Sequence, residues 1–265
     1  MMNTKIFITE MPNIYGREDK VMKIFDYHSH LGWDQKTNTF KCDELLLDMD
    51  EYGIEQRMVS ALYGYDISKQ NDVVAELVKK YPDRIVGCAV INPKLENCIE
   101  ETKRIVSTGL FKAIELDSLE HSYYPEATEN IDEIIDIATK NNMPVNVFTG
   151  WGPRTMPAQW AYYAKKHKDM RMVLLHMGTT DFGYGCIDLV KNSENLWVET
   201  SCMYEFPILR RAFKNIPEEK FLFGTHFPHK FTKCSIDTFD LLNLDESFRN
   251  KLFYENAVNF LNIGE

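Results

Sequence analysis

The sequence lacks the features that would assign it to several specialised classes of protein. It has no run of the roughly 20 apolar residues that a membrane helix requires. Residues 1–11 show no sustained apolar segment behind a basic start, so a signal peptide is not expected. Basic clusters are absent and the formal net charge is -10, which argues against nucleic acid or an anionic membrane as the main partner. We therefore expect a small-molecule partner, and the sequence leaves open whether the chain forms a homo-oligomer.

Paired cysteine motifs are also missing. The six cysteines are scattered and none forms a Cys-x-x-Cys pair. In a chain of this length such a distribution is typical of free, mostly buried thiols in a reducing compartment, so we expect a cytoplasmic protein. The cysteines are Cys42, Cys88, Cys98, Cys186, Cys202 and Cys234.

Short apolar runs alternate with longer amphipathic segments along the sequence. Most of the short runs are continuously apolar, as expected for strands that are buried on both faces of a parallel sheet. Eight strands are predicted over residues 22–27, 56–62, 84–91, 111–116, 144–148, 171–175, 196–200 and 221–223. Helical spacing of apolar residues predicts helices over residues 43–52, 71–80, 131–138, 158–167, 185–192, 208–213 and 247–261.

This alternation predicts the fold class. Strictly alternating strands and helices imply a parallel sheet, and eight such units favour closure into a barrel over an open sheet. Barrels of this kind occupy about 250 residues as a single unit. We therefore expect one α/β domain over residues 1–265, a distorted (β/α)8 TIM barrel, with a short extension at residues 6–20 before the first barrel strand.

Histidines concentrate where the predicted strands end, which is the face of a (β/α)8 barrel that carries the active site. His28 and His30 are one residue apart, and an extended backbone directs such a pair to one face, where both can reach one metal ion. His176 ends the sixth strand, His226 ends the eighth, and His229 lies in the loop beyond. Taken alone, the His-x-His pair is equally compatible with surface or packed histidines, and a core histidine with satisfied hydrogen bonds is the less favoured alternative for His176. The convergence of the five histidines predicts a metal site, because neutral imidazole is a preferred ligand of zinc and similar metals.

Other polar residues near strand ends carry weaker signals. Glu115 ends the fourth strand and could be a metal ligand, a partner of a ligand or an exposed acid. Ser201 and Cys202 follow the seventh strand, but no local nucleophile motif surrounds them, which favours lining or packing roles. We interpret His121 and His167, which do not follow strands, as ordinary surface residues.

The motifs resemble those of the amidohydrolase-related family that includes the metal-dependent aminocarboxymuconate-semialdehyde decarboxylase and related decarboxylases. The resemblance runs through nearly the whole chain, at residues 25–32 with their His-x-His, 80–84, 90–93, 111–116, 144–150, 175–178, 222–228 and 254–261. It implies a divalent metal, usually zinc, with His28 and His30 as the first two ligands and His176 as the histidine that handles protons.

Two positions depart from the family pattern. The family usually has a ligating histidine at the end of the fifth strand, where this chain has Phe148, and an aspartate on the eighth strand, where it has His226. Phe148 cannot bind a metal, whereas His226 can. A rebuilt site of His28, His30 and His226, with Glu115 or water as a further ligand, is chemically reasonable for catalytic zinc.

The rebuilt site would be more cationic than the usual one and would favour an anionic substrate such as a carboxylate. The candidate substrate-binding residues, all in loops that follow predicted strands, are Trp33, Tyr63, Trp151 and His229. For the three aromatic residues, packing within the loops is an equally good interpretation.

Two functions from different classes follow. The first is a metal-dependent hydrolase or decarboxylase for a small, carboxylated or cyclic substrate, in which the metal activates water or polarises a carbonyl group while His176 and His226 serve in catalysis. The second is a metal-free, catalytically altered or inactive barrel whose histidines bind a small anion. A metal-free acid–base enzyme that uses His226 and His229 is a third hypothesis.

Overall fold

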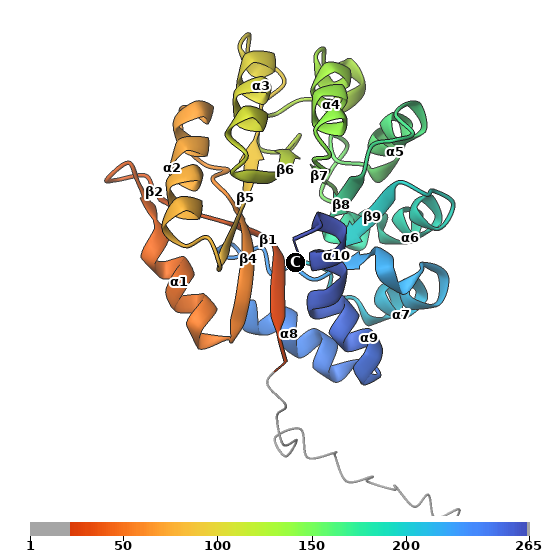
Figure 1. Cartoon of the computed structure of the whole chain (residues 1–265). Coiled ribbons are helices and arrows are strands. Elements are labelled where there is room, and N and C mark those ends of the chain that lie inside the picture. The colour runs from red at the N-terminus through yellow and green to blue at the C-terminus, as the bar shows by residue number, and fades with distance from the viewer. Residues whose placement is uncertain (1–21, 264–265) are drawn as a thin grey trace, which may run out of the picture.

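The computed structural model describes residues 22–263, and eight parallel strands form the centre of the molecule (Figure 1). The strands follow one another in the sheet in the order in which they occur in the chain. They are β1 Ile24–His30, β4 Ile54–Ser60, β5 Ile85–Val90, β6 Phe111–Leu116, β7 Val145–Phe148, β8 Met172–Leu175, β9 Leu196–Glu199 and β10 Phe221–Leu222. The last strand returns to the first through the bridge between Ser29 and Phe227, so the sheet closes into a barrel.

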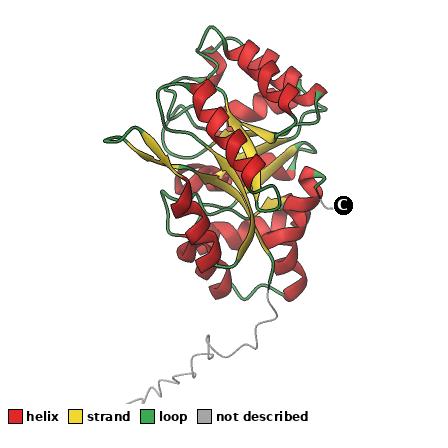
Figure 2. Ribbon diagram, turned by 60° about the vertical axis from the view of Figure 1, so that its left-hand side comes forward, coloured by secondary structure: helices red, strands yellow, loops and turns green. Residues whose placement is uncertain are grey.

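Helices surround the strands, as Figure 2 shows from the side. They are α1 Cys42–Glu51, α2 Ile67–Lys80, α3 Cys98–Thr108, α4 Ile131–Lys140, α5 Pro157–Lys166, α6 Thr179–Lys191, α7 Phe206–Asn215, α8 Thr232–Leu241, α9 Glu246–Asn250 and α10 Asn256–Leu261. A small antiparallel hairpin, β2 Gly32–Asp34 and β3 Thr39–Lys41, projects from the barrel after β1. None of the helices among residues 22–263 is both long and apolar enough to span a membrane.

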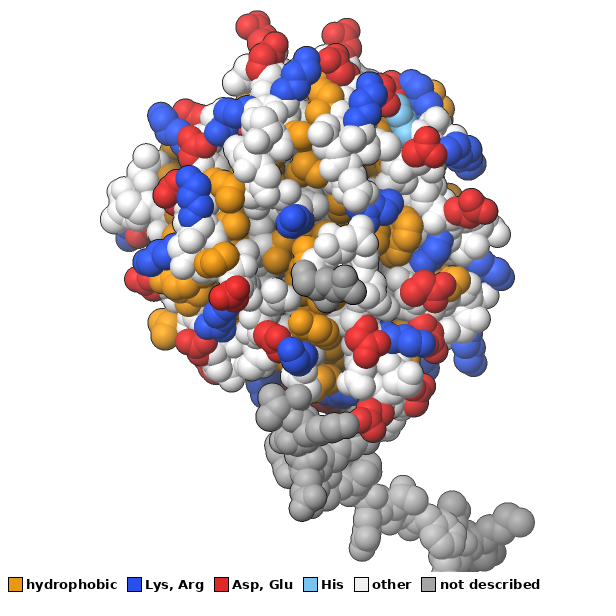
Figure 3. Space-filling model, viewed as in Figure 1, with side chains coloured by type: hydrophobic (Ala, Val, Ile, Leu, Met, Phe, Trp, Pro, Cys, Tyr) orange, Lys and Arg blue, Asp and Glu red, His pale blue; other side chains and the backbone are white. Residues whose placement is uncertain are grey.

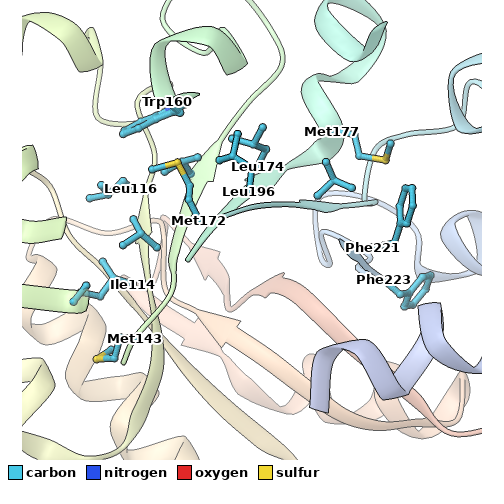
Figure 4. Packing of buried hydrophobic residues seen from close by; sticks show 14 of the residues in the cluster. Ile114, Leu116, Met143, Trp160, Met172, Leu174, Met177, Leu196, Phe221 and Phe223 are labelled. Atoms are coloured by element: carbon cyan, nitrogen blue, oxygen red, sulfur yellow. The ribbon is translucent and has the colours of Figure 1, made fainter. Parts of the chain in front are cut away.

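Alternate residues of the strands divide the core into two parts. On β6, Ile114 and Leu116 face outward and pack with apolar residues of the surrounding helices such as Trp160 (Figure 4). Ala113 of the same strand faces the inside of the barrel. Because both faces of each strand are buried, the strands read as continuous apolar runs in the sequence.

The inside of the barrel is packed rather than open, and α10 covers one end of it. Phe260 and Leu261 of α10 pack with Phe25 and Tyr27 of β1, and α10 crosses the centre of the barrel in Figure 1. On that face, acidic and basic side chains are interspersed around the helical rim (Figure 3). The histidines lie at the other end, where the carboxyl ends of the strands meet.

The predicted barrel is confirmed, with differences in the bounds of its elements. The first strand extends to His30, so His28 and His30 lie within β1 and not after it. Helices α3 and α8 and the β2–β3 hairpin were not predicted, and the predicted terminal helix is α9 and α10 joined by a π-helical turn, Lys251–Glu255. The predicted N-terminal extension lies outside the described residues, so the single domain over residues 1–265 stays a prediction.

A buried ion pair lies beneath the seam where the barrel closes. Asp26 on β1 pairs with Arg57 on β4, with 2.8 Å between Oδ2 and Nε, and neither side chain is exposed. Asp26 also accepts hydrogen bonds from the backbone N–H and the hydroxyl of Thr225, at 2.9 and 2.6 Å, across the seam. Arg57 reaches Asp48 of α1 as well, at 2.7 Å. The pair therefore ties the first strand both to the second barrel strand and to the segment that follows β10.

We predict that Arg57→Met destabilises the fold by about 3–5 kcal/mol, because it leaves the buried Asp26 carboxylate without its charge partner. The measurement is the free energy of unfolding in urea. Lys23→Met is the matched control, since it removes the exposed Lys23–Glu55 pair and should cost less than about 1 kcal/mol. Equal effects of the two substitutions would contradict the role given to Arg57.

Candidate active site

The first strand delivers two histidines to the mouth of the barrel. Pairing of β1 with β4 shifts register between Asp26 and Ser29, and an irregularity of this kind re-aims side chains at the rim of a barrel. His28 and His30 are both buried. The backbone groups of His28 and His30 bond to the segment after β10, through His226 N–H to His28 O at 2.8 Å and His30 N–H to Phe227 O at 2.7 Å.

Two further histidines reach the same place from left-handed backbone turns. His176 follows β8 with φ 63° and His226 follows β10 with φ 58°. Residues other than glycine rarely adopt this backbone conformation, and those that do concentrate at functional sites. The ring centroid of His176 lies 4.7 Å from that of His226 and 5.0 Å from that of His28. His226 lies 5.2 Å from His28 and 5.1 Å from His30, so four imidazole rings form one cluster.

Two buried carboxyl groups flank His28. Glu115 on β6 places Oε1 3.7 Å from His28 Nε2, and Glu199 on β9 places Oε2 3.7 Å from His28 Nδ1. Glu199 also accepts backbone hydrogen bonds from Ser201 and His176. Gly224 makes room for it, because a Cβ atom there would lie 2.2 Å from Glu199 Oε1.

The donor set fits a divalent metal ion. Among residues 22–263, two groups of three residues each offer ligand atoms within 4.8 Å of one another, His28 with His176 and His226, and His28 with His30 and Glu115. Several of these atoms are buried without a hydrogen-bond partner in the described part of the chain, which is costly unless a ligand or ion pairs with them. The unpartnered atoms are His28 Nδ1 and Nε2, His30 Nε2, His176 Nε2, His226 Nδ1 and Glu115 Oε1.

The protonation states of the histidines and carboxyl groups in the cluster also fit a divalent metal ion. Burial, followed by the neighbouring histidines, lowers the pKa of His28, His30 and His176 well below the usual value, so these rings are neutral at neutral pH. Burial lowers the pKa of His226 to about 3. Neutral imidazole is the form that binds metals. Burial raises the pKa of both Glu115 and Glu199 to about 8, and a cation between them would favour their ionised forms.

Phe148, which stands where the family usually has a ligating histidine, forms part of an aromatic wall beside the cluster. Its ring centroid lies 4.8 Å from that of His176. Trp151 lies 5.6 Å from both Phe148 and His176, and it is partly exposed. On another side, Tyr63 packs against His229 with 4.8 Å between centroids.

The structure brings together most, but not all, of the residues predicted for the site. His28, His30, His176, His226 and Glu115 converge, and Tyr63, Trp151 and His229 surround them. Trp33 instead belongs to β2, where it packs against Phe40 of β3 and Tyr65 of the loop between β4 and α2, so its predicted place in the pocket has no support.

The reading of His121 as an ordinary surface residue is wrong. It is partly buried beside a separate cavity of about 300 Å³ at the carboxyl end of the barrel, and burial lowers its pKa to about 4. His167 is mostly buried and contacts Asp132 and Asp136 at 2.7 and 3.0 Å on the outside of the barrel.

Glu199 is the main residue that the sequence did not single out. It is an acid at the end of an apolar strand, which is the same signal that drew attention to Glu115, and it is fully buried. Ser201, expected to line or pack, hydrogen-bonds both Glu199 and His176. Ser60 at the end of β4 was also missed, although it contacts His30 at 2.7 Å.

The comparison with protein families supports the same class of barrel. Residues 25–263 match the model of the amidohydrolase family. Because the match extends over most of the chain, the protein belongs to the amidohydrolase family. Among curated proteins, none matches this chain in sequence.

Solved structures with the same fold include several enzymes. The 5-carboxyvanillate decarboxylase of Sphingomonas paucimobilis is 12% identical with a TM-score of 0.72, over 92% of this chain and 100% of that chain. A dihydroxybenzoic acid decarboxylase from a Polaromonas species, with bound manganese and the inhibitor 2-nitroresorcinol, is 18% identical with a TM-score of 0.70, over 92% and 98%. A probable 2-pyrone-4,6-dicarboxylic acid hydrolase of Acinetobacter baumannii, with citric acid bound, is 14% identical with a TM-score of 0.69, over 91% and 100%.

Gly224→Ala should disturb the site directly, because its added Cβ would overlap Glu199 Oε1 and lie 3.1 Å from His28 Cβ. We expect a loss of about 1–3 kcal/mol in unfolding free energy, together with weaker metal binding. Gly185→Ala is the matched control, since a Cβ on this residue of α6 meets nothing within 4 Å and alanine favours a helix. If Gly224→Ala proved as stable and as competent in metal binding as Gly185→Ala, the place assigned to Glu199 would be wrong.

Proposed function

We propose that this chain is a metal-dependent enzyme, a decarboxylase or hydrolase, that acts on a small carboxylated substrate at the histidine cluster. The observation that carries the proposal is the set of buried, neutral histidines next to two carboxyl groups, each histidine with at least one ring nitrogen that has no hydrogen-bond partner among residues 22–263. Zinc is our first candidate, because imidazole nitrogen is among its preferred ligands, and manganese is the metal named for a similar structure.

The ligands we propose are His28, His30 and His226 with Glu115, and His176, which groups with His28 and His226, would bind the metal or the substrate. A bound divalent metal would supply Lewis-acid chemistry, polarising a carbonyl or carboxylate oxygen and making water more acidic. The protein supplies a site closed from bulk water, because all four histidine side chains are buried. His176, with Nε2 unpartnered, would accept or donate a proton on the substrate.

The surroundings of the cluster favour a flat, negatively charged substrate. Lys230 lies 6.0 Å from the ring centroid of Trp151, and its charge contributes to the lowered pKa of His176, His226 and His229. The ammonium group therefore stands at the exposed side of the cluster, where it could bind a carboxylate. Phe148 and Trp151 offer aromatic faces against which a planar ring could pack.

The similar structures agree with this class of substrate. The two decarboxylases are named for aromatic carboxylic acids, and the hydrolase is named for a pyrone dicarboxylic acid. The shared chemistry is a carboxylate on a flat ring. We propose that class for this chain, with removal of the carboxylate or opening of the ring as the two candidate reactions.

We propose further that the protein works in the cytoplasm as a single-domain enzyme, alone or as a homo-oligomer. Support for the compartment comes from the cysteines, all six of which are free and three of which are buried. The metal-free barrel that binds an anion is the second candidate function, and Lys230 beside the histidines is the observation that favours it.

Removal of the metal should abolish turnover. The protein is assayed for decarboxylation of hydroxylated benzoic acids and for hydrolysis of pyrone carboxylic acids. We expect the activity that it shows to be lost after treatment with a chelator and to be restored by added zinc or manganese. His28→Ala should reduce kcat/KM by more than about 100-fold and resist restoration, because it removes a residue common to both candidate ligand sets. His167→Ala, on the outer surface, is the control and should be restored fully. Turnover that persists in fully metal-free protein would favour a metal-free mechanism instead.

Lys230→Gln should weaken the binding of carboxylated substrates. We expect a rise in KM of about tenfold, equivalent to about 1.4 kcal/mol, with little change in kcat or metal content. Lys233, three residues after Lys230, is the control. Lys233→Gln removes the same charge, from a pair with Asp237, and should leave KM unchanged. An unaltered KM in Lys230→Gln would mean that the carboxylate binds elsewhere.

A further inference from the structure

Two histidines of the cluster each have a serine hydroxyl within hydrogen-bond distance of Nδ1, although they come from opposite parts of the barrel. His176 Nδ1 lies 2.8 Å from Ser201 Oγ, and that hydroxyl donates to Glu199 Oε2 at 2.8 Å. On the other side of the cluster, His30 Nδ1 lies 2.7 Å from Ser60 Oγ, and the Ser60 hydroxyl is near enough to Glu115 to lower the pKa of that carboxyl group. All six side chains are at most 1% exposed, so water does not compete for these contacts.

We propose that Ser201 with Glu199, and Ser60 with Glu115, are positioning pairs that place the ring proton of His176 and His30 on Nδ1 and leave both Nε2 atoms bare. The consequence for metal binding rests on the proposed function, whereas the position of the ring proton does not.

The direction of the hydrogen bonds carries the assignment. A serine hydroxyl has a single proton, and an ionised carboxylate can only accept. Once the hydroxyl of Ser201 donates to Glu199, its oxygen is left to accept from the ring, so Nδ1 of His176 must carry the hydrogen. Two backbone N–H groups, of His176 and Ser201, also donate to Glu199 and hold it in the accepting role. For His30 the observed part is the contact of Nδ1 with Ser60 Oγ, and the donation from Ser60 to Glu115 belongs to the proposal.

A proton on Nδ1 leaves the Nε2 atom of each ring free to bind a cation or a substrate proton. His30 Nε2 and His176 Nε2 are both buried, and neither has a hydrogen-bond partner among the residues that the structure describes. Bare nitrogens offer lone pairs to a cation or to a substrate proton, whereas an N–H group in that place would repel the cation and find no acceptor. Orienting partners of this kind are typical of metal-binding histidines.

The other two members of the cluster differ and provide an internal comparison. Within residues 22–263, neither ring nitrogen of His28 has a hydrogen-bond partner, and its two flanking carboxyl groups lie 3.7 Å away. His226 Nδ1 is likewise unpartnered. We therefore expect no serine-dependent ring proton on His28 or His226.

The test is a long-range proton–nitrogen correlation spectrum of metal-free, full-length protein with ¹⁵N-labelled histidine, recorded at pH 9, above the pKa of about 8 of the two carboxyl groups. We expect His176 and His30 to show a protonated Nδ1 and a bare Nε2. Ser201→Ala should shift His176 alone toward protonated Nε2, and Ser60→Ala should shift His30 alone, so that each variant is the control for the other. Ser201→Thr, which keeps the hydroxyl, should restore the wild-type pattern.

Metal affinity provides the second measurement and separates this inference from the proposed function. Ser201→Ala and Ser60→Ala should each weaken zinc or manganese binding by about 10–100-fold. Wild-type protein that binds no metal but shows both Nδ1 protons would overturn the proposed function and leave the positioning pairs in place. A protonated Nε2 in wild-type His176 or His30, or a spectrum that Ser201→Ala leaves unchanged, would overturn the positioning pairs even if metal binds.

Discussion

The arrangement of the site depends on how the barrel closes between its first and last strands. The last strand, β10, has only two residues, and the chain beyond it follows β1 through three backbone hydrogen bonds, from Tyr27 to Phe223, from His226 to His28 and from His30 to Phe227. Asp26 lies beneath this seam. Its carboxylate holds Thr225 on one side, pairs with Arg57 on the other and accepts from the N–H of His28 at 3.2 Å. Because His226 follows Thr225 directly, its distance from His28 is set by this buried carboxylate.

The negative charge of the site comes from strands other than the one that closes the barrel. With His226 where the family usually has an aspartate, the eighth strand adds no negative charge. The carboxyl groups beside His28 come instead from β6 and β9, through Glu115 and Glu199 on opposite sides of the ring. A divalent ion held by neutral imidazoles would thus find carboxylates on two sides, which would offset its charge in a buried place. Phe148 contributes a flat apolar surface in place of a ligand, which fits a site that binds a ring.

Much of this could be predicted from the sequence, for identifiable physical reasons. The barrel followed from the alternation of apolar runs and amphipathic segments, and the convergence of His28, His176 and His226 followed from their places at strand ends. Glu199 was missed because strands buried on both faces are apolar throughout, so the sequence does not show which face a polar residue takes. The role of Ser201 was also hidden, since its contacts depend on the left-handed turn that places His176. Trp33 lies outside the predicted pocket because it belongs to the β2–β3 hairpin, and the sequence has no strong turn motif that would have predicted this hairpin.

We expect the histidine cluster to bind one divalent metal ion, and the proposed chemistry depends on that ion. The most direct measurement is anomalous diffraction from crystals of the wild-type protein grown with manganese, with His28→Ala crystals as the comparison. We predict a single strong peak per chain within bonding distance of His28 and at least two of His30, His176, His226 and Glu115, and no peak there in the variant. A cluster without a peak in the wild type, or a peak only at exposed acidic residues elsewhere, would contradict the account.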